Sequence, residues 1–277
     1  MFDFWRDVWS LGIARNALFA ALLTGVSCGV VGTYVITRRI SYIAGAIAHS
    51  VLGGLGAAQY ADRVLGWTWM DPLYGAFAAA LLSAAIIGFA AQKGAEREDT
   101  IIGAVWAVGM AIGILFMYHT PGYSQDLFSY LFGDILLVTR SEVIFTAVLD
   151  VILVAAAIYF YRPMQAVCFD EEFARLRNVR VNLYYGLMLA ATAVTVVLLS
   201  MVVGLVLAIA LLTLPAAIAG RFARSMAGMM VLAGLICMAF NVLGLTASYA
   251  ADWPTGPTII ILAGAAYFAT LLLPSRG

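Results

Sequence analysis

The charged residues of this chain are confined to short gaps between apolar stretches that are each long enough to cross a lipid bilayer. Hydrophobic residues make up 64% of the chain and charged residues 11%, and the mean hydropathy is +0.99. A water-soluble fold of this length needs a more polar surface than that. A surface that faces lipid does not, because the outside of the protein can be as apolar as its core. The sequence therefore predicts an all-α, polytopic transmembrane helix bundle.

About eight or nine spans are expected, since each crossing takes roughly 20 residues. A further run at 127–138 is too short to cross and predicts a re-entrant or peripheral segment. The aromatic residues of segment 1–11 predict a short helix in the membrane interface. The apolar runs of sufficient length fall at 12–37, 40–60, 72–92, 100–118, 141–161, 183–201, 204–220, 228–249 and 257–273.

The basic residues predict how the bundle is oriented. Nine alternating spans place five basic groups, which hold eleven of the fifteen basic residues, on one side of the membrane. By the positive-inside rule that side is cytoplasmic. The N-terminus is then outside, the C-terminus is inside, and the polar loop 163–182 is cytoplasmic. The five groups are Arg38 with Arg39, Lys93 with Arg97, Arg162 to Arg180, Arg221 with Arg224, and Arg276.

Charge and cysteine content exclude several classes of function. The formal net charge of zero argues against a nucleic-acid partner, because phosphate binding needs a basic surface. The chain is expected to be a single membrane domain, 12–277, with no room for a nucleotide-binding domain. Cys28, Cys168 and Cys237 are too scattered for a disulfide framework or a cysteine-based zinc site, and inert thiols are expected.

His49, one of only two histidines, lies within a span on a face rich in small residues. Gly45, Gly53 and Gly56 share that face, which predicts close helix packing. An ionisable group at membrane depth is a functional candidate, and neutral imidazole is a common ligand of transition metals. The alternative is a histidine that hydrogen-bonds a neighbouring helix.

Three other side chains are weaker candidates. Asp150 lies near the middle of the 141–161 span, where a carboxylate is costly unless it is paired or faces water. It is either part of a transport pathway or a buried structural acid. Asp134 is expected at the end of the short apolar run, in a structural role. His119 is expected in an external loop, as an ordinary interfacial residue or as a contact for an external protein.

Four segments, in order along the chain, resemble the permease subunits of the zinc/manganese/iron-uptake ABC transporters. The first is RRISYIAGAIAHSVLGG (38–54), and the second pairs DTIIGAVWAVGMAIG (99–113) with YLFGDIL (130–136). The third is VVGLVLAIALLTLPAAIAGRFARSM (202–226), and a further echo is GLTASYAADWPTGPTIIIL (244–262).

This resemblance implies a non-catalytic subunit of a bacterial plasma-membrane importer, working as a homodimer or a pair of permeases. It implies a cytoplasmic ATP-binding subunit, an external metal-binding protein, and zinc, manganese or iron(II) as the transported ion. The family's metal-pathway histidine falls on His49, and Gly45 stands where the family usually carries an acid. The segment 213–226 would couple to the ATPase through an amphipathic cytoplasmic helix. Its candidate residues are Pro215 near the end of a span, Arg221, Phe222 and Arg224.

Two other classes of protein stay open from the residues alone. A secondary transporter driven by an ion gradient would carry inverted repeats and broken helices with coupling carboxylates. No clear repeat occurs, and Asp150 is the one convincing mid-span acid. An intramembrane enzyme would need a catalytic constellation such as His-Glu-x-x-His, and that motif is absent from the chain.

Overall fold

The computed structural model describes residues 12–93, 98–121, 133 and 135–272, and every regular element within these ranges is helical. The interfacial helix expected at 1–11 lies outside the described residues, as does Asp134. In chain order the elements are α2 (Gly12–Thr37), α3 (Ser41–Arg63), α4 (Pro72–Lys93), α5 (Glu98–His119), the 3₁₀ turn η1 (Ile135–Leu137), α7 (Arg140–Tyr159), α8 (Tyr161–Phe169), α9 (Glu171–Leu176), α10 (Val181–Val203), α11 (Leu205–Phe222), α12 (Met226–Ala251) and α13 (Thr255–Leu271).

The expected apolar spans each coincide with a helix. Eight helices within the described ranges are long and apolar enough to cross a membrane, and α13 is an apolar helix of 17 residues. The prediction of an all-α polytopic bundle with eight or nine spans is therefore confirmed. Long apolar runs are a strong signal because only a helix satisfies its own backbone hydrogen bonds in lipid.

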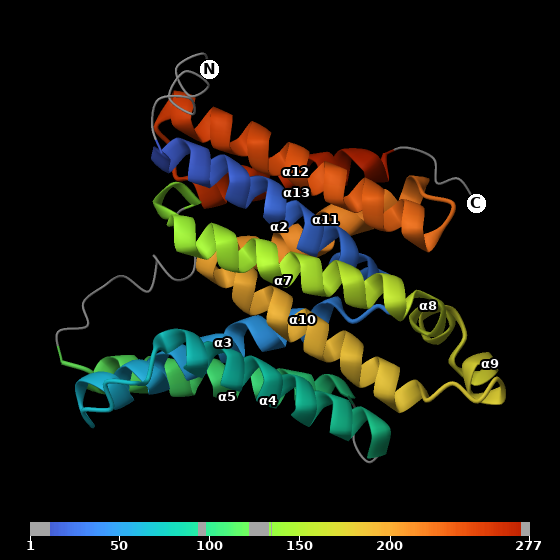
Figure 1. Ribbon diagram of the computed structural model, residues 1–277, viewed down its shortest axis with the longest axis horizontal. Coiled ribbons are helices and arrows are strands. Elements are labelled where there is room, and N and C mark those ends of the chain that lie inside the picture. Colours follow the sequence, from blue (N-terminus) through green and yellow to red (C-terminus); the bar gives the residue numbers. More distant parts are fainter. Residues whose placement is uncertain (1–11, 94–97, 122–132, 134, 273–277) are drawn as a thin grey trace.

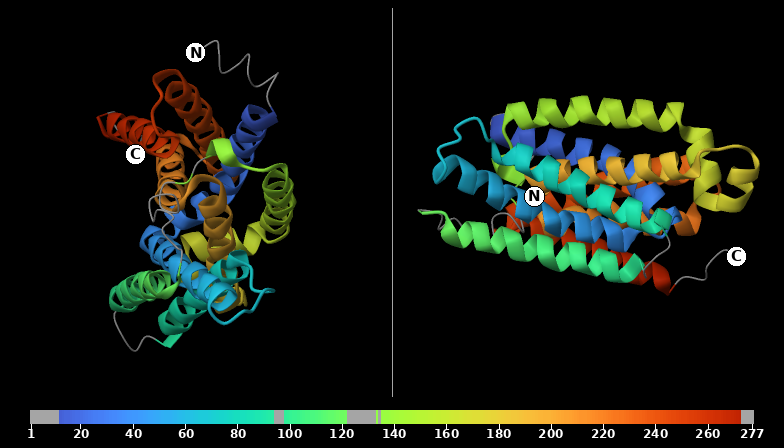
Figure 2. Two further views of the ribbon diagram at one scale, coloured as in Figure 1. Left: turned by 90° about the vertical axis from the view of Figure 1, so that its left-hand side faces the viewer. Right: turned by 90° about the horizontal axis from the view of Figure 1, so that it is seen from below.

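Helix α10 lies at the centre of the bundle and divides it into two groups (Figure 1). The group of α3, α4 and α5 packs on one side of α10, while α2, α11, α12 and α13 pack on the other. Figure 2 shows the same division end-on, with α7 lying along the outside of α2. Buried side chains on α10, such as Leu189 and Val197, join α3, α4 and α5 to parts of α2 and α11 in one buried cluster, while α13 and most of α12 pack in separate clusters.

Glycine allows the closest helix pairs to touch through their backbones. A Cβ atom added to Gly54 would overlap the backbone carbonyl of Gly75, so α3 and α4 meet without intervening side chains. A Cβ on Gly29 would lie 2.6 Å from the Met230 carbonyl oxygen, which fixes α2 against α12 in the same way. Small residues perform this role in membranes because no hydrophobic effect draws one helix to another.

Two segments differ from the sequence-based expectation. The polar segment 163–182, expected as a loop, carries the short helices α8 and α9. The segment 213–226 is not a separate amphipathic helix. It forms the last part of α11, an extended residue at Ala223 and the start of α12. Pro215, expected near the end of a span, lies buried inside α11, which continues to Phe222.

The described part of the run 127–138 does not cross the bundle. Ile135–Leu137 forms one 3₁₀ turn that packs against α2, and the side-chain amide of Asn16 donates to the Val138 carbonyl at 3.4 Å. Nearby, Gly133 has a φ of 57°, and a Cβ there would overlap the backbone of Val203 and Gly204. Gly133 therefore packs directly against the junction of α10 and α11.

Candidate metal pathway and coupling end

His49 is the ninth residue of α3, about 12 Å along the helix axis from its start. Its ring is half-buried and stacks on the Trp106 ring of α5, with the centroids 4.5 Å apart and the planes 17° from parallel. The Nδ1 atom is buried and accepts or donates no hydrogen bond among the described residues. A hydrogen bond from Nδ1 to a neighbouring helix, which was the alternative expectation for His49, is thus not present among the described residues.

Trp106 occupies the space beside Gly45, one helical turn before His49. A Cβ atom on Gly45 would lie 2.9 Å from Cζ3 of the Trp106 ring, closer than carbon atoms pack. The indole also lies against Tyr42, with the ring centroids 5.5 Å apart and the planes tilted by 39°. Tyr42, Trp106 and His49 therefore form an aromatic row along one side of α3, in which Trp106 is the only member from α5.

The register of α3 on α5 is set by glycines further along both helices. A Cβ on Gly53 would lie 2.8 Å from the Gly109 carbonyl oxygen, and one on Gly56 would lie 2.8 Å from that of Gly113. These two backbone contacts are one turn apart on each helix, so α3 and α5 run side by side in the same direction. Sliding α5 by one residue would break both contacts and withdraw Trp106 from His49.

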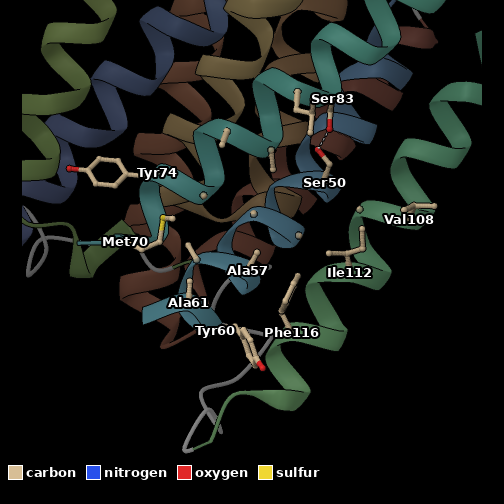
Figure 3. A pocket seen from close by; sticks show the side chains of 18 of the residues that line it. Ser50, Ala57, Tyr60, Ala61, Met70, Tyr74, Ser83, Val108, Ile112 and Phe116 are labelled. Carbon is tan, nitrogen blue, oxygen red and sulfur yellow. Dashed lines mark hydrogen bonds between the residues drawn. The ribbon is translucent and has the colours of Figure 1, made fainter. Parts of the chain in front are cut away.

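An apolar cavity of about 950 Å³ opens between α3, α4 and α5, and Gly53 and Gly109 are among the residues that line it. Figure 3 shows Ala57 of α3 and Ile112 of α5 among its lining residues, and the rings of Tyr60 and Phe116, which also line it, lie 5.4 Å apart. Its polar feature is the hydroxyl pair in which Ser83 donates to Ser50 at 2.7 Å (Figure 3). His49 does not line this cavity.

Asp150 lies buried at the contact of α7 with α2, well away from His49 in the other half of the bundle. Its Oδ1 atom accepts a hydrogen bond from the Ser27 hydroxyl, while Oδ2 is buried with no partner among the described residues. On α2, which carries Ser27, the Thr24 hydroxyl accepts a hydrogen bond from the Asn241 side-chain amide of α12 at 2.9 Å. The face of α2 that carries Thr24 and Ser27 thus collects the polar side chains of both neighbouring helices.

The described residues contain no group of three or more His, Cys, Asp or Glu side chains that could hold a metal ion. His119 is exposed at the end of α5, where its Nδ1 contacts the Leu115 carbonyl at 2.9 Å. The three cysteines are free and buried. Cys168 lies on α8, where burial raises the pKa of its thiol to about 11.

One end of the bundle gathers the α2–α3 turn, α8, α9 and the α11–α12 junction. Arg38, in the turn, makes an ion pair with Glu171 of α9, and Arg175 pairs with the same carboxylate at 2.7 Å. The backbone N–H of Ala227, on α12, donates to the Tyr161 hydroxyl of α8 at 3.1 Å. Of the residues expected to couple to an ATPase, Phe222 and Arg224 are exposed at this end and Arg221 is half-buried.

Sequence reasoning missed Trp106 and the pairing of Arg38 with Glu171. Trp106 is a large aromatic residue inside the small-residue run GAVWAVG, which is a signal that the residue fills a gap between helices. For the ion pair no local signal exists, since its partners are 133 positions apart.

Comparison with known proteins gives the family. Residues 10–273 match the model of the ABC 3 transport family. A probable metal transport system membrane protein of Chlamydia pneumoniae is 38% identical over 98% of this chain and 92% of its own length. The manganese transport system membrane protein MntC of Halalkalibacterium halodurans is 30% identical over 99% of this chain and 92% of its own length.

Among solved structures, PsaBC from Streptococcus pneumoniae in complex with Fab is similar over 100% of this chain and 97% of the matched chain. The TM-score is 0.87 and the sequence identity is 28%. The fold described above and the family match cover the same residues, including every helix from α2 to α13. This chain belongs to the ABC 3 transport family.

Proposed function

We propose that this chain is the membrane permease of a bacterial ABC importer that moves a divalent transition-metal ion across the plasma membrane. The names of its relatives support metal as the transported class, and the relative from Halalkalibacterium halodurans is a manganese transport system membrane protein. Zinc and iron(II) remain in the proposal because imidazole also suits these ions.

The observation that carries the proposal is an imidazole at membrane depth with an unpartnered nitrogen. A buried polar atom without a hydrogen bond is costly, so it persists where function requires it. His49 meets this description on α3, and its Nδ1 is the only unpartnered histidine nitrogen among the buried side-chain atoms of the described residues. In a dimer, a second His49 could supply another nitrogen. A transit site of so few ligands binds weakly enough to release its ion.

The chain offers its own control for this assignment, because it has two histidines. His49→Ala should abolish most ATP-driven metal uptake by vesicles that contain the assembled transporter. His119→Ala, at the exposed end of α5, should leave uptake near that of the unaltered protein. Both variants should insert and bind the ATPase normally. Full uptake by His49→Ala at normal expression would show that the metal passes elsewhere.

The end of the bundle that carries α8, α9 and the α11–α12 junction is proposed to dock the ATP-binding subunit. The basic residues gather at this end, which supports a cytoplasmic location for it and, with it, the proposal of an external N-terminus and a cytoplasmic C-terminus. The short helices α8 and α9 project from this end (Figure 1). On α9, Phe173 and Leu176 are exposed apolar side chains. Exposed Phe222 and Arg224 extend the same surface.

A homodimer sharing one external metal-binding protein completes the proposal. The helices α5 and α7 expose apolar side chains such as Val108 and Val151, and these surfaces are available to lipid or to a second copy. Cysteine crosslinking between two copies, followed by mass measurement of the detergent-solubilised complex, would establish the stoichiometry. A monomeric complex with one ATPase would contradict it.

A further inference from the structure

We infer that Trp106 determines which metal ions His49 can pass, by filling the space one helical turn before the imidazole and so excluding a side-chain oxygen ligand there. The α3 face that carries His49 then offers imidazole nitrogen to the ion, which favours ions of the zinc and iron(II) class over manganese. This inference rests on the proposed role of His49.

Trp106 fills the space next to His49, beside Gly45. The Cζ3 and Cη2 atoms of Trp106 would lie 2.9 and 3.3 Å from a Cβ on Gly45. Any side chain at position 45, and an acid in particular, therefore requires the indole to move. The indole also contacts Tyr42, with ring centroids 5.5 Å apart, and its helix is fixed on α3 by the glycine contacts. Trp106 and Gly45 are complementary shapes, and together they exclude a ligand one turn before His49.

The residues of α3 next to His49 on the helix surface lack side chains that could bind a metal ion. The residues three and four positions from His49 are Gly45, Ala46, Leu52 and Gly53, none of which carries a side-chain oxygen, nitrogen or sulfur. The adjacent hydroxyl of Ser50 is engaged, because it donates to the Ile47 carbonyl at 2.7 Å and accepts from Ser83. None of these immediate α3 neighbours of His49 therefore offers a free side-chain oxygen.

The imidazole of His49 is oriented by its contact with the Trp106 ring. Stacking on Trp106 covers one face of the ring but leaves its edge, where both nitrogens lie, uncovered by the indole. The near-parallel planes hold the ring in one orientation without a hydrogen bond to either nitrogen from Trp106. Neighbours that orient a metal-binding histidine normally also engage one nitrogen. Here the orientation comes from an apolar contact, and Nδ1 stays unpartnered.

The chemical consequence follows from ligand preference. Imidazole nitrogen suits zinc, iron, nickel and copper, whereas carboxylate and carbonyl oxygen suit manganese and magnesium. A site restricted to imidazole therefore discriminates against manganese. Trp106 itself binds no ion and is a positioning residue that sets the selectivity of His49.

The test measures uptake of zinc and manganese, each supplied alone as the free ion, by vesicles that contain the full transporter with its ATPase. The unaltered protein should prefer zinc. Trp106→Ala should reduce zinc uptake by about 10-fold, as for other residues that orient a metal ligand. Trp106→Phe should restore most of it, because phenylalanine can stack on His49.

The decisive variant is the pair Gly45→Asp with Trp106→Ala, in which a carboxylate gains the space of the indole. The double variant should move the zinc-to-manganese ratio toward manganese, while Gly45→Asp alone should lose uptake of both ions. A smaller perturbation, Gly45→Ala, displaces the indole slightly and should lower zinc uptake. Its matched control is Gly103→Ala on α5, where a Cβ would meet nothing within 4 Å.

The outcomes separate the inference from the proposed function. An unaltered protein that prefers manganese, or Trp106 variants that lower both ions equally with the ratio unchanged, would overturn the selectivity role while His49 keeps its place. Uptake that survives His49→Ala would instead remove the pathway assignment on which the inference rests. The thermal stability of each purified variant shows whether lost uptake reflects unfolding. If Trp106→Ala fails to fold, the comparison of Gly45→Ala with Gly103→Ala still tests the inference.

Discussion

Asp150 shows how a single carboxyl group is accommodated inside the membrane part of the molecule. One oxygen accepts from Ser27 and the other is buried without a partner among the described residues. An ionised carboxylate with an unsatisfied oxygen would be very costly there, whereas a neutral carboxylic acid costs far less. The geometry therefore favours a protonated acid that ties α7 to α2.

A neutral tether predicts that Asp150→Asn is tolerated. The amide oxygen can still accept from Ser27, so the midpoint of thermal unfolding in detergent should change little. Asp150→Ala should destabilise the protein by about 1–3 kcal/mol, because the Ser27 hydroxyl loses its acceptor. Val151→Ala, on the exposed face of α7, is the control. If Asp150→Asn folds normally but transports nothing, the carboxyl group belongs to the pathway and the structural role is wrong.

At this scale the sequence predicted single residues better than their surroundings. His49 and Asp150 were identifiable because ionisable side chains inside apolar runs are rare. The stacking of Trp106 on His49 was not, because it depends on the register of two helices separated by α4. That register is set by backbone contacts between glycines, and a small-residue face alone does not reveal its partner.

Among the elements, the α2–α3 turn is the link between the proposed docking end and the helix that carries His49. Arg38 precedes Arg39, which adopts a left-handed conformation with φ of 60°, and Ile40 then donates to the Val35 carbonyl at 2.9 Å. This tight turn joins α2 directly to α3. Since Arg38 is paired with Glu171, a displacement of α9 by a docked ATPase would act on α3.

Reversing this ion pair tests the link. Arg38→Glu and Glu171→Arg should each lower uptake and raise ATP hydrolysis that is not coupled to transport, because two like charges then face each other. The double variant restores opposite charges and should recover much of the coupling. Arg180→Glu, at an exposed position after α9 and in no ion pair among the described residues, is the control. Equal effects of all three single variants would mean that general surface charge, not this pair, matters.

The pair also predicts a dependence on pH. Hydrogen bonds from Arg38, and then from Arg175, lower the pKa of Glu171 below its ordinary value of 4.5. A lowered pKa means that the contribution to stability is complete above the unfolded-state pKa and is lost as pH falls through the folded-state value. ATPase binding should therefore be constant between about pH 6 and 8. In Arg38→Ala the loss of ATPase binding on acidification should begin at a higher pH, as measured by co-purification across a pH series. The same acidic pH dependence in Arg38→Ala and the unaltered protein would contradict the pairing.

The elements themselves were predictable where the bilayer dictates their length and less so where it does not. Every long apolar run became a helix. The short helices α8 and α9 were missed because the polar segment has no long apolar period. A local signal was present, since Asp170 caps α9 by accepting from the Phe173 N–H at 2.9 Å, and two acids follow in the first turn. Ser225 caps α12 similarly, which separates α12 from α11 where one coupling helix was expected.

For the whole molecule, the two helix groups around α10 suggest how an outside energy source could act. The docking end contacts both groups, because Arg38 leads into α3 while Tyr161 reaches α12. Closure of two ATPase subunits could then tilt one group against the other and expose His49 to alternate sides of the membrane. An ion-gradient transporter would instead need a coupling carboxylate that exchanges its ion during transport, and the one buried acid among the described residues, Asp150, is held against Ser27.

The energy source is therefore the property that best separates these two classes of transporter. In sealed vesicles carrying the permease and its ATPase, metal uptake should require ATP on the side of α8 and α9. It should persist when proton and sodium gradients are collapsed, because no gradient enters the cycle. Vesicles with the permease alone should take up no metal above background even with a gradient imposed. A variant of the ATPase that binds but does not hydrolyse ATP is the matched control and should stop transport. Gradient-driven uptake by the permease alone would place this chain outside ATP-driven transport despite its family.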